Sequence, residues 1–125
     1  MALPPRKATI LVVEDEFLVR LLVSEELRTA EFHVIEALDA EEAIAVLNSG
    51  VRVDLILSDV RMPGAMDGLG LLAFVRRSHP TIPVIITSGH LQRDTAFDDN
   101  TQFLPKPYTF PQVIKLIGAT LGGDK

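Results

Sequence analysis

The chain has 125 residues, of which 47% are hydrophobic and 23% are charged, a balance typical of one globular domain with a single core. The net charge of −5 argues against nucleic acid as a direct partner, because phosphate backbones recruit basic surfaces. Cysteine is absent, which excludes disulfides, thiolate zinc sites and thiol nucleophiles and suits a reducing cytoplasm. No apolar run approaches the roughly 20 residues that span a bilayer, so we expect no membrane contact.

Apolar runs alternate with helical patterns along the chain, which favours βα units around a parallel sheet. Residues 1–7 contain no apolar signal-peptide region and are expected to form a short flexible arm. The expected strands are 9–13, 33–37, 55–58, 83–87 and 102–105. The strand at 55–58 is apolar almost throughout, as expected for a strand that is covered on both faces.

Four helical patterns follow the strands. Asp39 and Thr109 are predicted to cap two of these helices, because Glu42 and Gln112 stand three residues further on. A pattern ending near residue 80 gives a third helix, and the first helix follows the strand at 9–13. The predicted buried faces consist of Val19, Leu22, Val23, Leu27 and Ala30; Ala40, Ala43, Ile44 and Leu47; Leu71, Leu72 and Val75; and Val113, Ile114, Ile117 and Leu121.

The segment 89–100 lacks an apolar helical stripe. We expect at most a short or irregular helix there, between the fourth and fifth strands.

Acidic residues, a hydroxyl and a lysine stand at the ends of four of the apolar runs: Glu14, Asp15, Asp59, Ser88 and Lys106. In an open parallel sheet these ends meet at one edge, where ligands bind. Clustered carboxylates repel one another unless a cation or a proton joins them. A Mg²⁺ ion and a phosphoryl group would give the cluster a common purpose.

Five motifs occur in the order found in a known protein family. They are Glu14-Asp15, Asp59 to Pro63, Asp67-Gly68, Pro83 to Gly89, and Phe103 to Pro107. Over residues 8–121 the chain resembles the receiver domain of two-component response regulators, with 122–125 as a tail. The resemblance implies a flavodoxin-like, doubly wound (βα)5 sandwich with a five-stranded parallel sheet in the order 2-1-3-4-5. The fourth helix of that pattern is short or irregular here, so we expect an unusual output surface.

The resemblance also implies roles for single residues. Asp59 would accept a phosphoryl group, Lys106 would pair with it and then with a phosphoryl oxygen, and Ser88 would bind the phosphoryl group. Phe103 would change position together with Ser88 as a switch. The bond between Lys106 and Pro107 would be a cis peptide, which is costly except before proline.

Mg²⁺ would be held by Asp15, Asp59 and the backbone carbonyl of Arg61, with Glu14 acting through a bound water. Glu14 stands where this family usually has aspartate, and its longer side chain is compatible with a water-mediated role. Arg61 and His90 occupy positions that tune the lifetime of the phosphoryl group.

These features predict a cytoplasmic, single-domain receiver that takes its phosphoryl group from a histidine kinase or a histidine phosphotransfer protein. It would signal to an unknown downstream protein as a monomer or weak dimer, and would not be an enzyme beyond its own phosphorylation and dephosphorylation. Three alternatives stay open: a degenerate receiver that signals without phosphorylation, a phosphohydrolase with an aspartyl nucleophile, and a nucleotide- or flavin-binding domain. The second usually has an acid at position 61, and the third needs a phosphate-cradling loop where residues 14–16 are acidic.

Overall fold

A computed structural model of the chain describes residues 7–62, 64–89 and 97–122. The predictions that concern most of the N-terminal arm, Pro63, His90, the core of the segment 89–100 and residues 123–125 fall outside these ranges.

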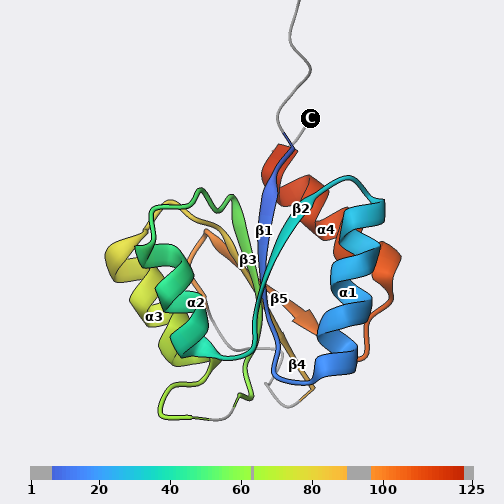
Figure 1. The fold of residues 1–125 in the computed structure, drawn as a ribbon. Coiled ribbons are helices and arrows are strands. Elements are labelled where there is room, and N and C mark those ends of the chain that lie inside the picture. Colours follow the sequence, from blue (N-terminus) through green and yellow to red (C-terminus); the bar gives the residue numbers. More distant parts are fainter. Residues whose placement is uncertain (1–6, 63, 90–96, 123–125) are drawn as a thin grey trace, which may run out of the picture.

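Five parallel strands form one sheet in the order β2-β1-β3-β4-β5 (Figure 1), which confirms the predicted topology. The strands are β1 (Thr9–Val13), β2 (His33–Ala37), β3 (Leu55–Asp59), β4 (Val84–Ser88) and β5 (Thr101–Pro105). Every residue of β1, β3 and β4 is buried, because helices cover both faces of the central strands. The strand ends extend one residue further than predicted at Asp59 and Ser88.

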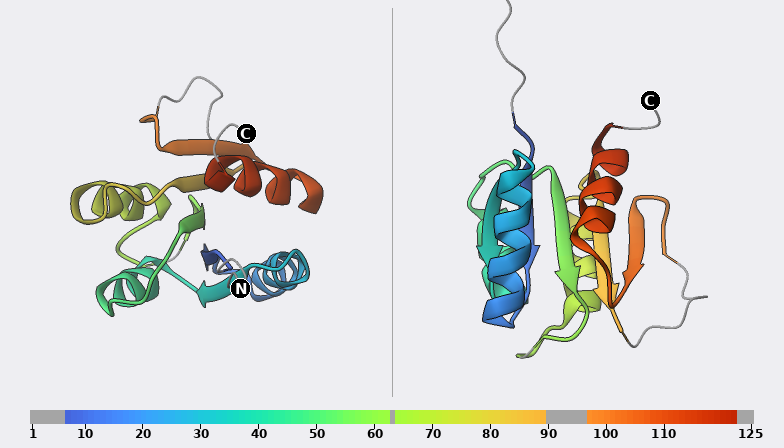
Figure 2. Two further views of the ribbon diagram at one scale, coloured as in Figure 1. Left: turned by 90° about the horizontal axis from the view of Figure 1, so that it is seen from above. Right: turned by 90° about the vertical axis from the view of Figure 1, so that its right-hand side faces the viewer.

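Helices cover the two faces of the sheet in pairs (Figure 2), with α1 and α4 on one face and α2 and α3 on the other. The helices are α1 (Phe17–Thr29), α2 (Ala40–Asn48), α3 (Gly68–Ser78) and α4 (Phe110–Gly122). Alternate residues of β1 serve the two layers, since Ile10 packs with the α1–α4 core and Leu11 with the α2–α3 core. None of the helices in the described ranges is long and apolar enough to cross a membrane.

Side-chain caps fix the starts of α2, α3 and α4 at the carboxyl edge of the sheet, whereas the start of α1 has no side-chain cap. Asp39 accepts a hydrogen bond from the backbone N–H of Glu42 at 2.9 Å, as predicted. Thr109 and Gln112 make a reciprocal pair at the start of α4, with bonds of 2.7 and 3.3 Å. Asp67 caps α3 through the N–H of Gly70 at 2.9 Å. These caps hold the helix ends beside the strand ends that carry the site.

The buried face predicted for α1 was wrong at Leu22, whose side chain is 47% exposed. Val19, Val23 and Leu27 follow a four-residue spacing toward the sheet, and Leu22 lies at the margin of that stripe. There it lines a groove of ≈ 430 Å³ between α1 and the start of α4, together with Tyr108 and Phe110.

Candidate functional site

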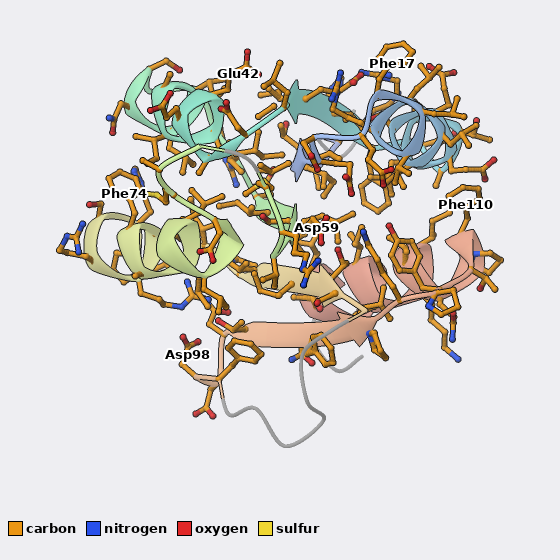
Figure 3. The ribbon with its side chains drawn as sticks, turned by 90° about the horizontal axis from the view of Figure 1, so that it is seen from below. Phe17, Glu42, Asp59, Phe74, Asp98 and Phe110 are labelled. Carbon is orange, nitrogen blue, oxygen red and sulfur yellow. The ribbon has the colours of Figure 1, made fainter. Side chains whose placement is uncertain are left out.

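The side chains at the ends of the central strands meet at the carboxyl edge of the sheet, with Asp59 at the centre of that edge in Figure 3. Carboxylate oxygens of Glu14, Asp15 and Asp59 lie within 4.8 Å of one another. The ammonium of Lys106, which follows β5, lies 3.3 Å from Oδ2 of Asp59 and 3.6 Å from Oε1 of Glu14. Residues from three strands thus come together as the sequence indicated.

The cluster carries more negative than positive charge in a partly buried place. Glu14 is 5% and Asp59 8% exposed, whereas Asp15 is open to solvent. Burial raises the pKa of Glu14, and the nearby Asp59 adds to this, against the lowering effects of the Glu16 N–H and Lys106. Burial alone would lower the pKa of Lys106, but Glu14 and Asp59 outweigh it and raise that pKa. The site therefore favours a bound cation.

Backbone hydrogen bonds between neighbouring strands place these side chains. The N–H of Glu14 donates to the carbonyl of Ala37 at 3.0 Å, which extends the β1–β2 pairing past the end of β1. The N–H of Lys106 donates to the carbonyl of Ser88 at 2.9 Å, and this bond continues the β4–β5 pairing. The backbone positions of Glu14 and Lys106 are therefore fixed by pairing between strands.

Gly68, the first residue of α3, allows that helix to approach the strand end that carries Asp59. Its N–H donates to the carbonyl of Val60 at 2.8 Å. A Cβ atom at this position would collide with the backbone carbonyl of Asp59. Glycine is thus required for close packing here, which gives the Asp67-Gly68 motif a structural reason.

The other predicted site residues lie around a hollow of ≈ 380 Å³ above Asp59. Arg61 and Ser88 line it together with Asp15 and Lys106. Ser88 is buried at 3% exposure. Phe103 is half-buried, packs against the α2–α3 core and does not line the hollow. The peptide bond between Lys106 and Pro107 is cis.

The donor set at this edge is suited to a hard divalent cation. Mg²⁺ takes oxygen ligands, commonly one or two carboxylates, and keeps several of its waters. The three carboxylates converge within 4.8 Å, and the hollow above them leaves room for waters and a small anion. The residues present therefore fit a magnesium ion.

Comparison with known proteins gives the class to which this fold and site belong. The sequence model of the response regulator receiver domain matches residues 10–118, so the chain belongs to the response regulator receiver family. The chain is 39% identical over 111 residues to the sensor kinase CckA of Brucella abortus, covering 85% of this chain and 12% of that protein. It is 34% identical over 116 residues to the transcriptional regulator NtrC of Salmonella typhimurium, covering 90% and 24%.

Solved structures agree with this family. The receiver domain of the hybrid histidine kinase CckA matches with a TM-score of 0.80 and 36% identity, covering 91% of this chain and 99% of that one. A response regulator receiver protein from Sinorhizobium medicae matches with a TM-score of 0.86 and 27% identity, covering 95% and 98%. The chain spans only about an eighth to a quarter of the curated relatives CckA and NtrC.

The sequence interpretation missed two residues beside the cluster. Arg20 donates from Nη1 to the backbone carbonyl of Glu14 at 2.8 Å. Its signal was a long basic side chain one turn into the helix that follows the acidic pair. Tyr108 lies under the site, where burial raises its pKa while the charge of Lys106 opposes this. Its position, two residues after Lys106, gave no comparable signal.

Proposed function

We propose that Asp59 accepts a phosphoryl group from a phosphohistidine, in a Mg²⁺-dependent reaction, and that the change is passed on through protein–protein contacts. The observation that carries this proposal is the pairing of Asp59 with Lys106 at 3.3 Å inside a converging set of carboxylates. Phosphoryl transfer needs positioned groups and neutralised charge more than it needs acid–base catalysis. Membership of the receiver family supports the same conclusion.

The reaction is a displacement at phosphorus. A carboxylate oxygen of Asp59 forms the new O–P bond, the P–N bond of the phosphohistidine breaks, and its electron pair returns to the imidazole. The product is an acyl phosphate on Asp59. A bound Mg²⁺ would neutralise charge on the reacting oxygens, and Asp15, Asp59 and the carbonyl of Arg61 would hold it, with Glu14 acting through a water.

The chain's own residues account for the remaining roles. Lys106 exchanges its contact with Asp59 for one with a phosphoryl oxygen, and Ser88 donates its hydroxyl to another. Phe103 follows the movement of Ser88 and alters the surface beside β5. Arg61, exposed at the rim of the hollow, tunes how readily water reaches the acyl phosphate.

The donor is a histidine kinase or a histidine phosphotransfer protein in the cytoplasm. A protein donor must approach Asp59 through the hollow, and an apolar surface adjoins that hollow across Glu16 and Lys106, which line both. This surface contains Leu22, at 47% exposure, and Phe110, which Figure 3 labels. Exposed apolar patches of this kind commonly mark protein contacts, so we assign the donor to this side of the molecule.

The proposal is tested with Mg²⁺ and acetyl phosphate, followed by intact mass measurement of the protein and of the Asp59→Asn variant. The parent is expected to gain one phosphoryl group and the variant none. Omitting Mg²⁺ should abolish the gain. Equal phosphorylation of parent and variant would contradict the assignment of Asp59.

The docking surface is tested separately with a panel of phosphorylated histidine kinases. A kinase that phosphorylates the parent should transfer more slowly to a Leu22→Ser variant, because Leu22 lines the groove, whereas the rate with acetyl phosphate should not change. Leu38→Ser is the matched control, because Leu38 is 42% exposed but does not line the groove. Equal slowing by both substitutions would overturn the assignment of this surface.

A further inference from the structure

Arg20 lies in the first turns of α1 and reaches back to the end of β1. Its Nη1 donates to the backbone carbonyl of Glu14 at 2.8 Å, and its Nε donates to Oε1 of Glu36 on β2 at 3.2 Å. The side chain is 14% exposed, and its guanidinium lies 5.6 Å from the ring centroid of Phe17. One rigid fork therefore joins α1, the β1–α1 turn and the edge strand.

The Glu14 carbonyl is the point at which this fork acts on the candidate metal site. The N–H of Glu14 is held by Ala37 at 3.0 Å, and its Oε2 accepts from the N–H of Glu16 at 3.1 Å. The carbonyl belongs to the peptide unit that leads directly into Asp15. Its direction therefore sets the direction in which the chain, and the exposed Asp15 carboxylate, leave the strand.

We propose that Arg20 is a positioning residue for the divalent cation: it fixes the peptide between Glu14 and Asp15 so that both carboxylates face Asp59. This inference rests on the proposed function, because it concerns the cation that serves phosphorylation. Glu36 holds the far side of the same guanidinium, and Arg28 contacts the second oxygen of Glu36 at 3.1 Å. Substituting a residue that orients a metal ligand commonly lowers metal affinity by about tenfold or more.

The charge of Arg20 and its hydrogen bond to Glu14 predict opposite changes in Mg²⁺ affinity when Arg20 is replaced. Arg20 is a cation near a site for another cation, so removing its charge should tighten Mg²⁺ binding if electrostatic repulsion were its only effect. A loss of its hydrogen bond to Glu14 should instead loosen the acidic pair and weaken binding. The sign of the change separates the two accounts.

The first test compares Mg²⁺ affinity in the parent, Arg20→Met and Arg28→Met by calorimetric titration of the whole chain. Arg28→Met is the matched control, since Arg28 lies on the same helix and contacts the same Glu36 but makes no contact with Glu14. We expect Arg20→Met to weaken Mg²⁺ binding about tenfold and Arg28→Met to leave it unchanged or slightly tighter. Unchanged or tighter binding in Arg20→Met would overturn the inference.

An Arg20→Lys variant covers the case in which methionine prevents folding. It keeps the charge but cannot bind both acceptors with one planar group. Weaker Mg²⁺ binding than in the parent supports positioning, whereas parent-like binding contradicts it.

The second test needs no metal and therefore separates this inference from the proposed function. Amide hydrogen exchange at Asp15 and Glu16 is measured in metal-free protein, with the middle of α1 as an internal reference. Arg20→Met should speed exchange at these two amides relative to the reference, and Arg28→Met should not. Unchanged exchange in Arg20→Met would overturn the positioning role, while a parent that binds no Mg²⁺ would count against the proposed function alone.

Discussion

The two ends of the sheet use the same kinds of charged residue in opposite ways. At the amino ends of β4 and β5, Arg76 donates to Oδ2 of Asp98 at 2.7 Å and to the carbonyls of Ile82 and Asn100 at 2.8 and 2.7 Å. It also donates to the hydroxyl of Thr101 at 2.6 Å. At the carboxyl ends, one lysine faces a cluster of three carboxylates.

The difference shows in the pKa directions of the acids. Burial and a neighbouring carboxylate raise the pKa of Glu14 at the carboxyl end. For Asp98 at the amino end, burial is the largest single effect and opposes ionisation, but the hydrogen bonds from Arg76, Asn100 and Thr101 together outweigh it and lower the pKa. We call the amino end matched, because its charged groups have partners and contribute to folding. We call the carboxyl end unmatched, because its surplus carboxylates cost folding energy and leave negative charge available for a ligand.

The largest expected effect is on the reaction itself, at the unmatched end. Lys106→Gln should slow phosphorylation by acetyl phosphate about 100-fold, because one positioned donor for the transferring group is lost. The rate is measured by intact mass over time. Lys115→Gln is the control, since Lys115 is an exposed lysine on α4, and equal slowing in both variants would remove the special role of Lys106.

The next effect is on stability, at the matched end. Arg76→Ala should lower the free energy of unfolding by about 2 kcal/mol, because it leaves backbone carbonyls and Asp98 without their shared donor. Urea unfolding measures this change, and phosphorylation should persist under native conditions. The neighbouring Arg77, which is exposed, provides the control as Arg77→Ala; a loss as large as that of Arg76→Ala would contradict the account.

A smaller effect follows from the raised pKa of Glu14. A raised carboxyl pKa means that the folded state binds the proton more tightly, so the stability linked to Glu14 is complete below its ordinary pKa of 4.5 and is lost as pH rises through the folded value. In metal-free protein, Glu14→Gln should therefore be more stable than the parent near neutral pH. The gap should close at acidic pH in a series of thermal melts, and a gap that widens toward acid would contradict this sign.

The smallest effect has the opposite pH dependence and concerns Asp98. Because its pKa is lowered, its contribution is present above the ordinary value of 3.8 and is lost as pH falls through the folded value. Asp98→Asn should cost less than about 1 kcal/mol near neutral pH, since the ion pair is partly exposed. The difference from the parent should vanish in strong acid, and its persistence there would point to lost packing instead.

The fold could be predicted from the sequence because its signals are local. Apolar runs bounded by turns predicted the strands, and Asp39 and Thr109 indicated the starts of two helices. The cluster at Glu14, Asp59 and Lys106 followed from the rule that parallel strands present their carboxyl ends at one edge. None of these predictions depends on how side chains from distant elements pack.

What the sequence could not give depends on packing between elements. Leu22 has the spacing of a core residue, but it lines an open groove between α1 and the start of α4 and is 47% exposed. Arg20 gave no sign of its two acceptors, because Glu14 and Glu36 come from separate strands. The four contacts of Arg76 likewise unite segments that lie far apart in the chain.

The central claim is that the carboxyl end of the sheet keeps surplus negative charge for a divalent cation that serves phosphorylation. The most direct test is the thermal midpoint with and without Mg²⁺, for the parent and for Asp15→Asn. Mg²⁺ should stabilise the parent by about 2.7 kcal/mol at a concentration 100 times the dissociation constant, and should stabilise the variant much less at the same concentration. A parent midpoint that millimolar Mg²⁺ leaves unchanged would contradict the claim.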